Sequence, residues 1–135
     1  MMKVLIADDS EIIVSRLLAM FAGIQGVEIA DQAGTVAEAS RAAASLRPDV
    51  VILDLQMPDG NGLDVLKSMK GNSVTSTVIV LTNHAFPQYR KKCLQSGAHF
   101  FLDKSTEFEK VGELLQLLIN STSENPGSNT PAGEV

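Results

Sequence analysis

Short apolar runs alternate with segments in which apolar residues recur every three or four positions, and this alternation occurs five times along the chain. Short runs rich in β-branched side chains are typical of buried strands, and the longer period is typical of helices. We predict strands at residues 3–7, 27–32, 49–53, 77–81 and 98–102. The second is more polar than the others, so we expect it at an edge of the sheet.

Helices are predicted between and after these strands, at residues 10–21, 35–46, 62–70, 86–96 and 106–119. Thr35 with Glu38, and Thr106 with Glu109, have the spacing of a capping box at a helix start. Gly97 is expected to end the fourth helix in a left-handed conformation. After residue 120 the composition changes to Ser, Asn, Pro, Gly and Glu, which cannot bury much apolar area. We therefore predict one domain at residues 1–120 and a disordered polar tail at 121–135.

Alternating strands and helices with short connections predict parallel strands joined by right-handed crossovers. The expected fold class is α/β, a flavodoxin-like doubly wound five-stranded parallel sheet of order 2-1-3-4-5 and (βα)5 topology. A composition of 44% hydrophobic but only 4% aromatic residues suits such a sheet, because its strands are buried on both faces by aliphatic side chains.

Charge and cysteine content narrow the function classes. The net charge is -5 with no basic cluster that would neutralise phosphates, so direct binding of nucleic acid is not expected. No apolar run approaches the roughly 20 residues of a membrane span, and no secretory leader precedes the first strand. The single Cys93 excludes an internal disulfide and suits a reducing compartment. We expect a cytoplasmic protein without a membrane partner.

Acidic residues follow the first and third predicted strands. Asp8, Asp9 and Asp54 should meet at the carboxyl edge of the sheet, at the switch point between these strands. Mg²⁺ prefers oxygen ligands, so we predict a magnesium site there, with the backbone carbonyl of Gln56 as a further ligand. The alternative is that the acidic pair only caps the first helix and that Asp54 is a turn or capping aspartate.

A carboxylate held beside Mg²⁺ can act as a nucleophile and form an aspartyl phosphate, which makes Asp54 the candidate phosphoacceptor. Lys104, after the fifth strand, could bind phosphate oxygens through its ammonium group. Thr82, after the fourth, could donate its hydroxyl to them. Taken alone, Lys104 could equally be a surface lysine, and threonine is common at strand ends.

These residues lie in stretches that match a known family: VLIADDS at 4–10, DLQMPDGNG at 54–62, VLT at 80–82 and GAHFFLDK at 97–104. Over about residues 2–120 the chain resembles the receiver domains of bacterial two-component response regulators. The resemblance implies a phosphoprotein in which Asp54 accepts phosphate from a sensor histidine kinase or phosphotransfer protein. It gives Asp8 and Asp9 the metal role, and Lys104 and Thr82 the phosphate contacts. It also implies that Phe101 is a switch aromatic that moves inward when Thr82 is drawn to the phosphate; simple core packing is the alternative.

Two positions depart from the family pattern. Ser105 stands where the family has a proline after a cis bond, and a trans Lys104–Ser105 bond is expected because a cis bond without proline costs about 2.5–4 kcal/mol. Asn83 stands where the family has a small residue, which could narrow access to the phosphoryl group. His84, the next residue, could orient water, cap the next helix or simply lie at the surface.

The resemblance implies a phosphorylation-activated signalling switch that controls a downstream protein partner and catalyses only its own phosphorylation and dephosphorylation. We expect a stand-alone receiver, with a phosphorelay intermediate or a fragment of a longer regulator as alternatives. Other classes stay open. A phosphatase of the haloacid-dehalogenase type would need an acid at the position of Gln56, and a nucleotide- or flavin-binding module would need a phosphate loop in place of Asp8 and Asp9. A third class is a docking module that has lost phosphorylation.

Overall fold

The computed structural model describes the backbone of residues 1–128 and the side chains of residues 1–121. A five-stranded parallel sheet forms its centre, in the order β2-β1-β3-β6-β7. The main strands are β1 (Met2–Ala7), β2 (Val27–Ala33), β3 (Val50–Leu53), β6 (Thr77–Thr82) and β7 (Phe100–Asp103). The predicted α/β fold, strand order 2-1-3-4-5 and edge position of the second strand are confirmed.

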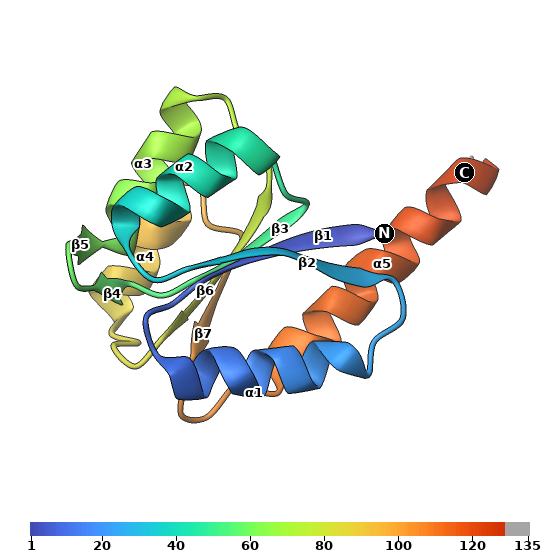
Figure 1. Ribbon diagram of the computed structural model, residues 1–135, viewed down its shortest axis with the longest axis horizontal. Coiled ribbons are helices and arrows are strands. Elements are labelled where there is room, and N and C mark those ends of the chain that lie inside the picture. Colours follow the sequence, from blue (N-terminus) through green and yellow to red (C-terminus); the bar gives the residue numbers. More distant parts are fainter. Residues whose placement is uncertain (129–135) are drawn as a thin grey trace.

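Five helices cover the two faces of the sheet (Figure 1). They are α1 (Glu11–Ala22), α2 (Val36–Leu46), α3 (Gly62–Gly71), α4 (Pro87–Gln95) and α5 (Lys110–Ser128). Helices α1 and α5 lie on one face, and α2, α3 and α4 lie on the other. Parallel strands need a crossover between them, and the right-handed crossovers distribute the helices over both faces.

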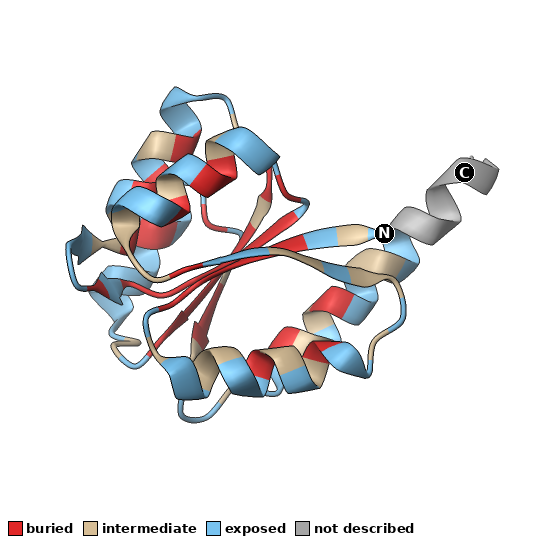
Figure 2. Ribbon diagram, viewed as in Figure 1, coloured by how far each residue is buried: buried red, intermediate tan, exposed pale blue. Residues whose placement is uncertain are grey.

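The sheet is the buried centre of the molecule: in Figure 2 its inner strands are mainly red, whereas the edge strand β2 and the outer helix faces are tan and blue. Side chains of β1 and β3 alternate between two cores, because successive residues of a strand point to opposite faces. Val4 and Ile6 pack under α1 and α5, whereas Leu5 and Ala7 pack under α2 and α3. Fully burying one such aliphatic side chain contributes about 1.5–3 kcal/mol, so the apolar runs seen in the sequence drive sheet formation.

Helices α1 and α2 each begin with a side-chain cap, and the cap of α1 is Ser10 and not the acidic pair. Ser10 caps α1, with its Oγ accepting from the Ile13 amide at 3.3 Å. Thr35 caps α2 by accepting from the Glu38 amide at 3.1 Å. The second half of the predicted capping box differs, because the Glu38 carboxylate accepts from the amide of Gly34 and not from that of Thr35. Gly97 has a φ of +113°, as its place after α4 requires.

The last helix departs most from the prediction. It begins at Lys110 and not at residue 106, so the predicted Thr106–Glu109 capping box is wrong. The preceding segment is closed instead by Asp103 and Glu107, because each backbone amide donates to an oxygen of the other residue. The helix also continues to Ser128, so residues 121–128 are helical where a disordered tail was predicted. Residues 129–135 lie outside the described part of the chain.

A short antiparallel hairpin, β4 (Gln56–Met57) and β5 (Gly60–Asn61), lies between β3 and α3 and was not predicted. Its strands are too short to give a periodic signal. Asn61 ends the hairpin and caps α3 in a capping box with Asp64. The hairpin therefore joins the carboxyl end of β3 to the first turn of α3.

Candidate functional site

The residues singled out in the sequence come together at the carboxyl edge of the sheet. Ala7 of β1 pairs with Leu53 of β3, so Asp8 and Asp54 follow on neighbouring strands. Their positions are fixed by backbone bonds, because the Asp54 amide donates to the Ala7 carbonyl at 2.9 Å. At the same edge, after the neighbouring strands β6 and β7, the Lys104 amide donates to the carbonyl of Thr82 at 2.8 Å. Parallel pairing thus brings residues up to 96 positions apart to one edge.

Asp8, Asp9 and Asp54 form an acidic cluster in which one carboxylate oxygen from each residue lies within 4.8 Å of the others. Asp8 and Asp54 are buried, and Asp9 is exposed. Oxygen ligands on opposite sides of Mg²⁺ lie about 4.1 Å apart, twice the metal–oxygen distance of ~2.05 Å. The limit of 4.8 Å within the cluster is close to this separation, so small side-chain movements would let the all-oxygen set hold a magnesium ion.

Lys104 provides the positive charge within this cluster. Its Nζ lies 2.8 Å from Asp8 Oδ2 and 3.5 Å from Asp54 Oδ2, and the lysine is only 7% exposed. Three carboxylates and one ammonium leave a net charge of about -2 when all are ionised, which a divalent cation would neutralise. The structure therefore rules out the alternative that Lys104 is an ordinary surface lysine.

Asp54 lies in an environment that opposes its ionised form. Burial, and next the neighbouring charge of Asp8, raise the pKa of Asp54 above its ordinary value of 3.8. Lys104 and the backbone amides of Gln56 and Leu55 act in the opposite direction. A carboxylate with a raised pKa and a cation within reach is typical of a functional site. The groups that favour the ionised form of Asp54 are those that would also stabilise phosphoryl oxygens bound there.

The hairpin packs directly behind Asp54. The Gly62 amide donates to the carbonyl of Leu55 at 2.8 Å, which closes the loop from 54 to 62. A Cβ atom at Gly62 would meet the backbone of Asp54 and Leu55, so only glycine allows this close approach. The backbone amide of Gln56 is one of the groups that lower the pKa of Asp54. Its carbonyl as a metal ligand stays a prediction.

Thr82 is fully buried at the end of β6, and its Oγ1 accepts a hydrogen bond from the His84 amide at 2.9 Å. Asn83 is exposed beside it. The His84 ring lies 6.4 Å from the ring of Phe86, measured between centroids. Phe86 is the N-cap residue of α4 and no side chain caps this helix, so the capping alternative for His84 is wrong.

Phe101 is buried on the α4 side of the sheet, in the same core as Val80 and Cys93. Phe100 packs on the opposite face, against the core under α1 and α5. The ring of Phe101 is thus already inside the protein. The Lys104–Ser105 bond is trans as expected, because the described chain contains no cis peptide bond.

Sequence reasoning missed two features around the hairpin. The Asn61–Asp64 capping box had a readable signal, since both residues stand at capping-box spacing before an apolar helix. Asp59 had none. Its carboxylate accepts from the amides of Val36 and Ala37, more than 20 residues earlier in the chain. No helix in the described part of the chain is long and apolar enough to cross a membrane.

Comparison with known proteins agrees with this geometry. The sequence model of the response regulator receiver domain matches residues 4–116. The uncharacterized transcriptional regulatory protein YhcZ of Bacillus subtilis is 32% identical over 116 residues, which are 86% of this chain but 54% of YhcZ. The chain thus spans about half the length of the curated relatives that it matches.

Solved structures show the same arrangement. The response regulator domain of Thermotoga maritima CheB superposes with a TM-score of 0.77 at 26% identity, covering 89% of this chain and 94% of that domain. A chain of the CheX–CheY–BeF3–Mg complex from Borrelia burgdorferi gives a TM-score of 0.78 at 29% identity, covering 87% and 88%. Members of this family are phosphoacceptor signalling domains of two-component systems and bind Mg²⁺ at an acidic pocket. With its matching fold and acidic cluster, the chain belongs to the response regulator receiver domain family.

Proposed function

We propose that this domain is a phosphorylation-activated switch in which Asp54 accepts a phosphoryl group from a histidine kinase or phosphotransfer protein. The observation that carries the proposal is the buried Lys104, whose ammonium group contacts both Asp8 and Asp54 of the all-oxygen cluster. A phosphatase of the haloacid-dehalogenase type is disfavoured, because Gln56 offers no acid at the position where that chemistry needs one.

The transfer needs only groups found at the site. A carboxylate oxygen of Asp54 attacks the phosphorus of a phosphohistidine, the bond between phosphorus and the imidazole nitrogen breaks, and the imidazole keeps the electron pair. Lys104 would exchange part of its pairing with Asp8 for a phosphoryl oxygen. Asp8, Asp9, Asp54 and the carbonyl of Gln56 would hold Mg²⁺, which would neutralise charge on the transferred group.

The switch that we propose runs through Thr82 and Phe101. The Thr82 hydroxyl, which now accepts from the His84 amide, would turn to donate to a phosphoryl oxygen. Because Phe101 is already buried, its response would be a shift within the core and not an entry from solvent. Such a shift would move α4, since Phe101 and Cys93 of α4 belong to the same core.

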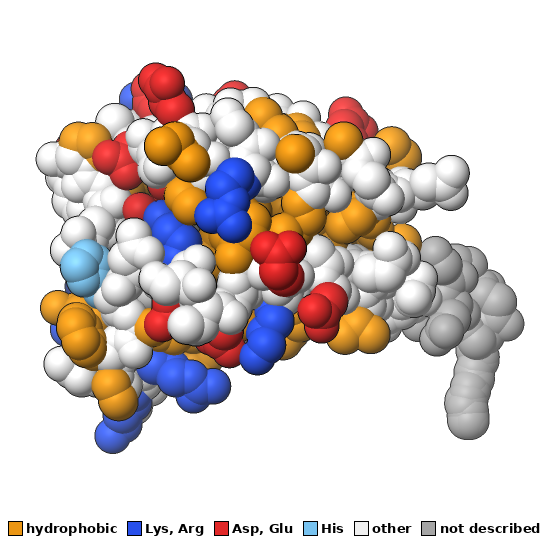
Figure 3. Space-filling view, turned by 90° about the horizontal axis from the view of Figure 1, so that it is seen from below, with side chains coloured by type: hydrophobic (Ala, Val, Ile, Leu, Met, Phe, Trp, Pro, Cys, Tyr) orange, Lys and Arg blue, Asp and Glu red, His pale blue; other side chains and the backbone are white. Residues whose placement is uncertain are grey.

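Helix α4 supports the view that this face meets a protein partner. Cys93 is its only buried residue, and no side chain caps its start. Phe86, Tyr89 and Leu94 are exposed large apolar side chains on or beside it, next to three consecutive basic residues, Arg90 to Lys92. Figure 3 shows hydrophobic and basic side chains side by side at one edge of the molecule. A partner with acidic and apolar side chains would complement this surface.

The domain is proposed to act through its own surface, without direct contact to nucleic acid. The alternatives are a phosphorelay intermediate and the control of an effector domain in a longer regulator. The second is favoured by YhcZ, a transcriptional regulatory protein of which this chain spans about half. A cytoplasmic location is part of the proposal, because two-component response regulators are generally cytoplasmic.

Intact mass spectrometry after incubation with acetyl phosphate and Mg²⁺ tests the proposed function. We expect a gain of one phosphoryl group in the wild type, none in Asp54→Asn, and a greatly reduced gain when EDTA replaces Mg²⁺. Asp31→Asn is the matched control, because it removes an exposed carboxylate of β2 that bonds only locally to the Gln32 amide. Failure of the wild type to gain mass from this donor and from a phosphorylated kinase would refute the proposal.

A further inference from the structure

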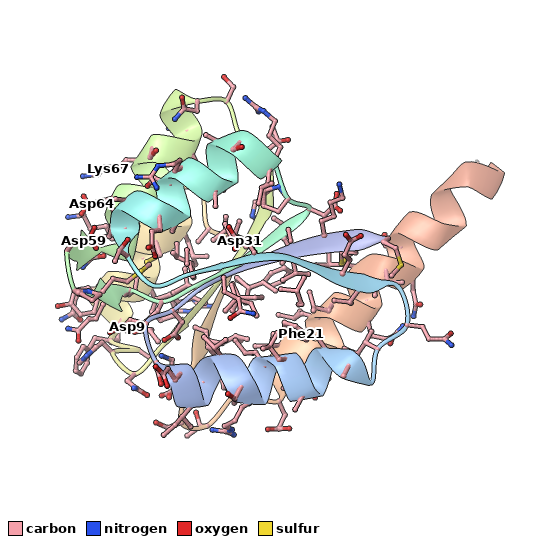
Figure 4. The ribbon with its side chains drawn as sticks, in the orientation of Figure 1. Asp9, Phe21, Asp31, Asp59, Asp64 and Lys67 are labelled. Carbon is pink, nitrogen blue, oxygen red and sulfur yellow. The ribbon has the colours of Figure 1, made fainter. Side chains whose placement is uncertain are left out.

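Asp59 connects the β4–β5 hairpin to the first turn of α2. Its Oδ1 accepts from the Val36 amide at 2.7 Å, and its Oδ2 accepts from the Ala37 amide at 3.1 Å. Figure 4 shows the side chain on the hairpin, beside the N-terminal end of α2. Neither the carboxylate cluster nor the phosphoryl chemistry proposed above uses Asp59, so its two bonds need their own explanation.

Capping of α2 does not by itself explain Asp59. The helix already has a local cap, because Thr35 accepts from the Glu38 amide and Glu38 accepts from the Gly34 amide. Asp59 takes the two first-turn amides that this cap leaves free. The bond to Val36 is the main reason why the pKa of Asp59 is lowered, so the side chain is a charged acceptor at neutral pH.

The hairpin that carries Asp59 directly follows Asp54 in the chain. The backbone amides of Leu55 and Gln56 lower the pKa of Asp54, and the loop is closed by the bond from Gly62 to the Leu55 carbonyl. Each hairpin strand has only two residues. An isolated hairpin of this size is marginal, so it needs an external support.

The segment just before α2 lies beside Asp8 and Asp9. The connection from β2 to α2 runs past the acidic pair, since the Asp8 amide donates to the Ala33 carbonyl at 2.9 Å. At Gly34, a Cβ atom would lie 3.8 Å from the Asp9 Cα. Asp59 therefore links the hairpin next to Asp54 to the start of α2, and the connection before α2 packs against the segment that carries Asp8 and Asp9.

We propose that Asp59 is a positioning residue for the cation site: by fixing the hairpin against α2, it sets the spacing at which Asp9 and Asp54 can bind one ion. This inference rests on the proposed function. It places Asp59 outside the ligand set, so its effect on Mg²⁺ is indirect. Residues that orient metal ligands typically change metal affinity by about 10–100-fold, and Asp59 acts one step further away, so we expect about tenfold or slightly less.

Calorimetric titration of the full chain with MgCl2 tests the inference directly, and it suits a protein that has no tryptophan for fluorescence. Asp59→Ala should weaken Mg²⁺ binding by about five- to tenfold, just below the range for residues that orient metal ligands directly. The Mg²⁺ affinity of Asp59→Asn should lie between those of Asp59→Ala and the wild type, because an amide oxygen can still accept one bond. Asp31→Ala is the matched control: it removes an equally exposed charge that lies away from the hairpin in Figure 4, and its affinity should equal that of the wild type.

Thermal unfolding in EDTA separates positioning from general stability. A lowered melting temperature of Asp59→Ala with unchanged Mg²⁺ affinity would overturn the inference and leave the proposed function intact. Equal weakening by Asp31→Ala would also overturn it, since only long-range charge would then be involved. If the wild type bound no Mg²⁺, the inference and the proposed function would fall together.

Discussion

Gly62 is the residue whose replacement tests the packing behind the phosphoacceptor most directly. In Gly62→Ala the new Cβ would lie 3.1 Å from the Leu55 Cα and 3.2 Å from the Asp54 carbonyl carbon, and closer still to the Asp54 carbonyl oxygen. All three are backbone atoms, so no side chain can rotate away. The clash can be relieved only if the hairpin or the first turn of α3 moves away from Asp54.

The size of the effect follows from two opposing contributions. Overpacking against a fixed backbone costs about 1–3 kcal/mol. Alanine regains about 0.4–1 kcal/mol by restricting the unfolded chain. We therefore expect Gly62→Ala to lower the free energy of unfolding by about 1–2 kcal/mol. With a urea slope of about 2 kcal/mol per M, within the usual range for small proteins, the unfolding midpoint should fall by roughly 0.5–1 M.

Urea unfolding followed by circular dichroism measures this change, and Gly71→Ala is its matched control. Gly71 is the last residue of the same helix, and a Cβ there would meet no atom within 4 Å. That variant should be stabilised by about 0.4–1 kcal/mol, since only the entropy contribution remains. A Gly62→Ala protein as stable as the wild type would refute the reasoning, as would equal losses in both variants.

Further predictions concern charge, capping and thiol reactivity. Burial and the charge of Asp8 raise the pKa of Asp54, so the folded state holds this proton where the unfolded state has lost it, and stability should fall as pH rises from 3.8 through the folded pKa. In EDTA at pH 7, Asp54→Asn should therefore be more stable than the wild type in urea unfolding, and the two curves should converge below pH 3.8; a less stable variant at pH 7 would contradict this. Ser10→Ala removes the side-chain oxygen that accepts from the Ile13 amide at the start of α1, so it should lower the free energy of unfolding by about 1 kcal/mol. Ser10→Thr keeps an oxygen acceptor and should change the free energy of unfolding little. The pKa of Cys93 is raised to about 11 by burial, so iodoacetamide should label the native protein at pH 8 no faster than it unfolds; rapid labelling measured by mass would show that α4 does not cover the thiol.

The fold was predictable because its signals are local and repeated. The apolar runs form strands because a parallel sheet is covered by helices on both faces, and each amphipathic segment forms a helix that buries one face. The position of Asp54 after such a run was enough to place it at the sheet edge. The resemblance of four short stretches to receiver domains added the roles of Lys104 and Thr82, which residue type alone left open.

The errors have specific physical causes. The start of α5 was placed at Thr106 because its spacing to Glu109 fits a capping box, but burial of Phe108 and the paired bonds of Asp103 and Glu107 hold that segment in turns. The β4–β5 hairpin was missed because its strands have two residues each and carry no periodicity. Propensity is a weak signal wherever tertiary contacts offer the backbone better partners.

The sequence by itself determined the order of strands and helices, the burial of the sheet and the set of charged residues at its carboxyl edge, because these depend on hydrophobic periodicity and on chain connectivity. Only the tertiary structure decided how the charges pair. It placed the Lys104 ammonium between Asp8 and Asp54, and it brought the Asp59 carboxylate to the amides of α2. Such contacts join residues distant in sequence, and their strength depends on distances of a few ångströms that no local pattern encodes.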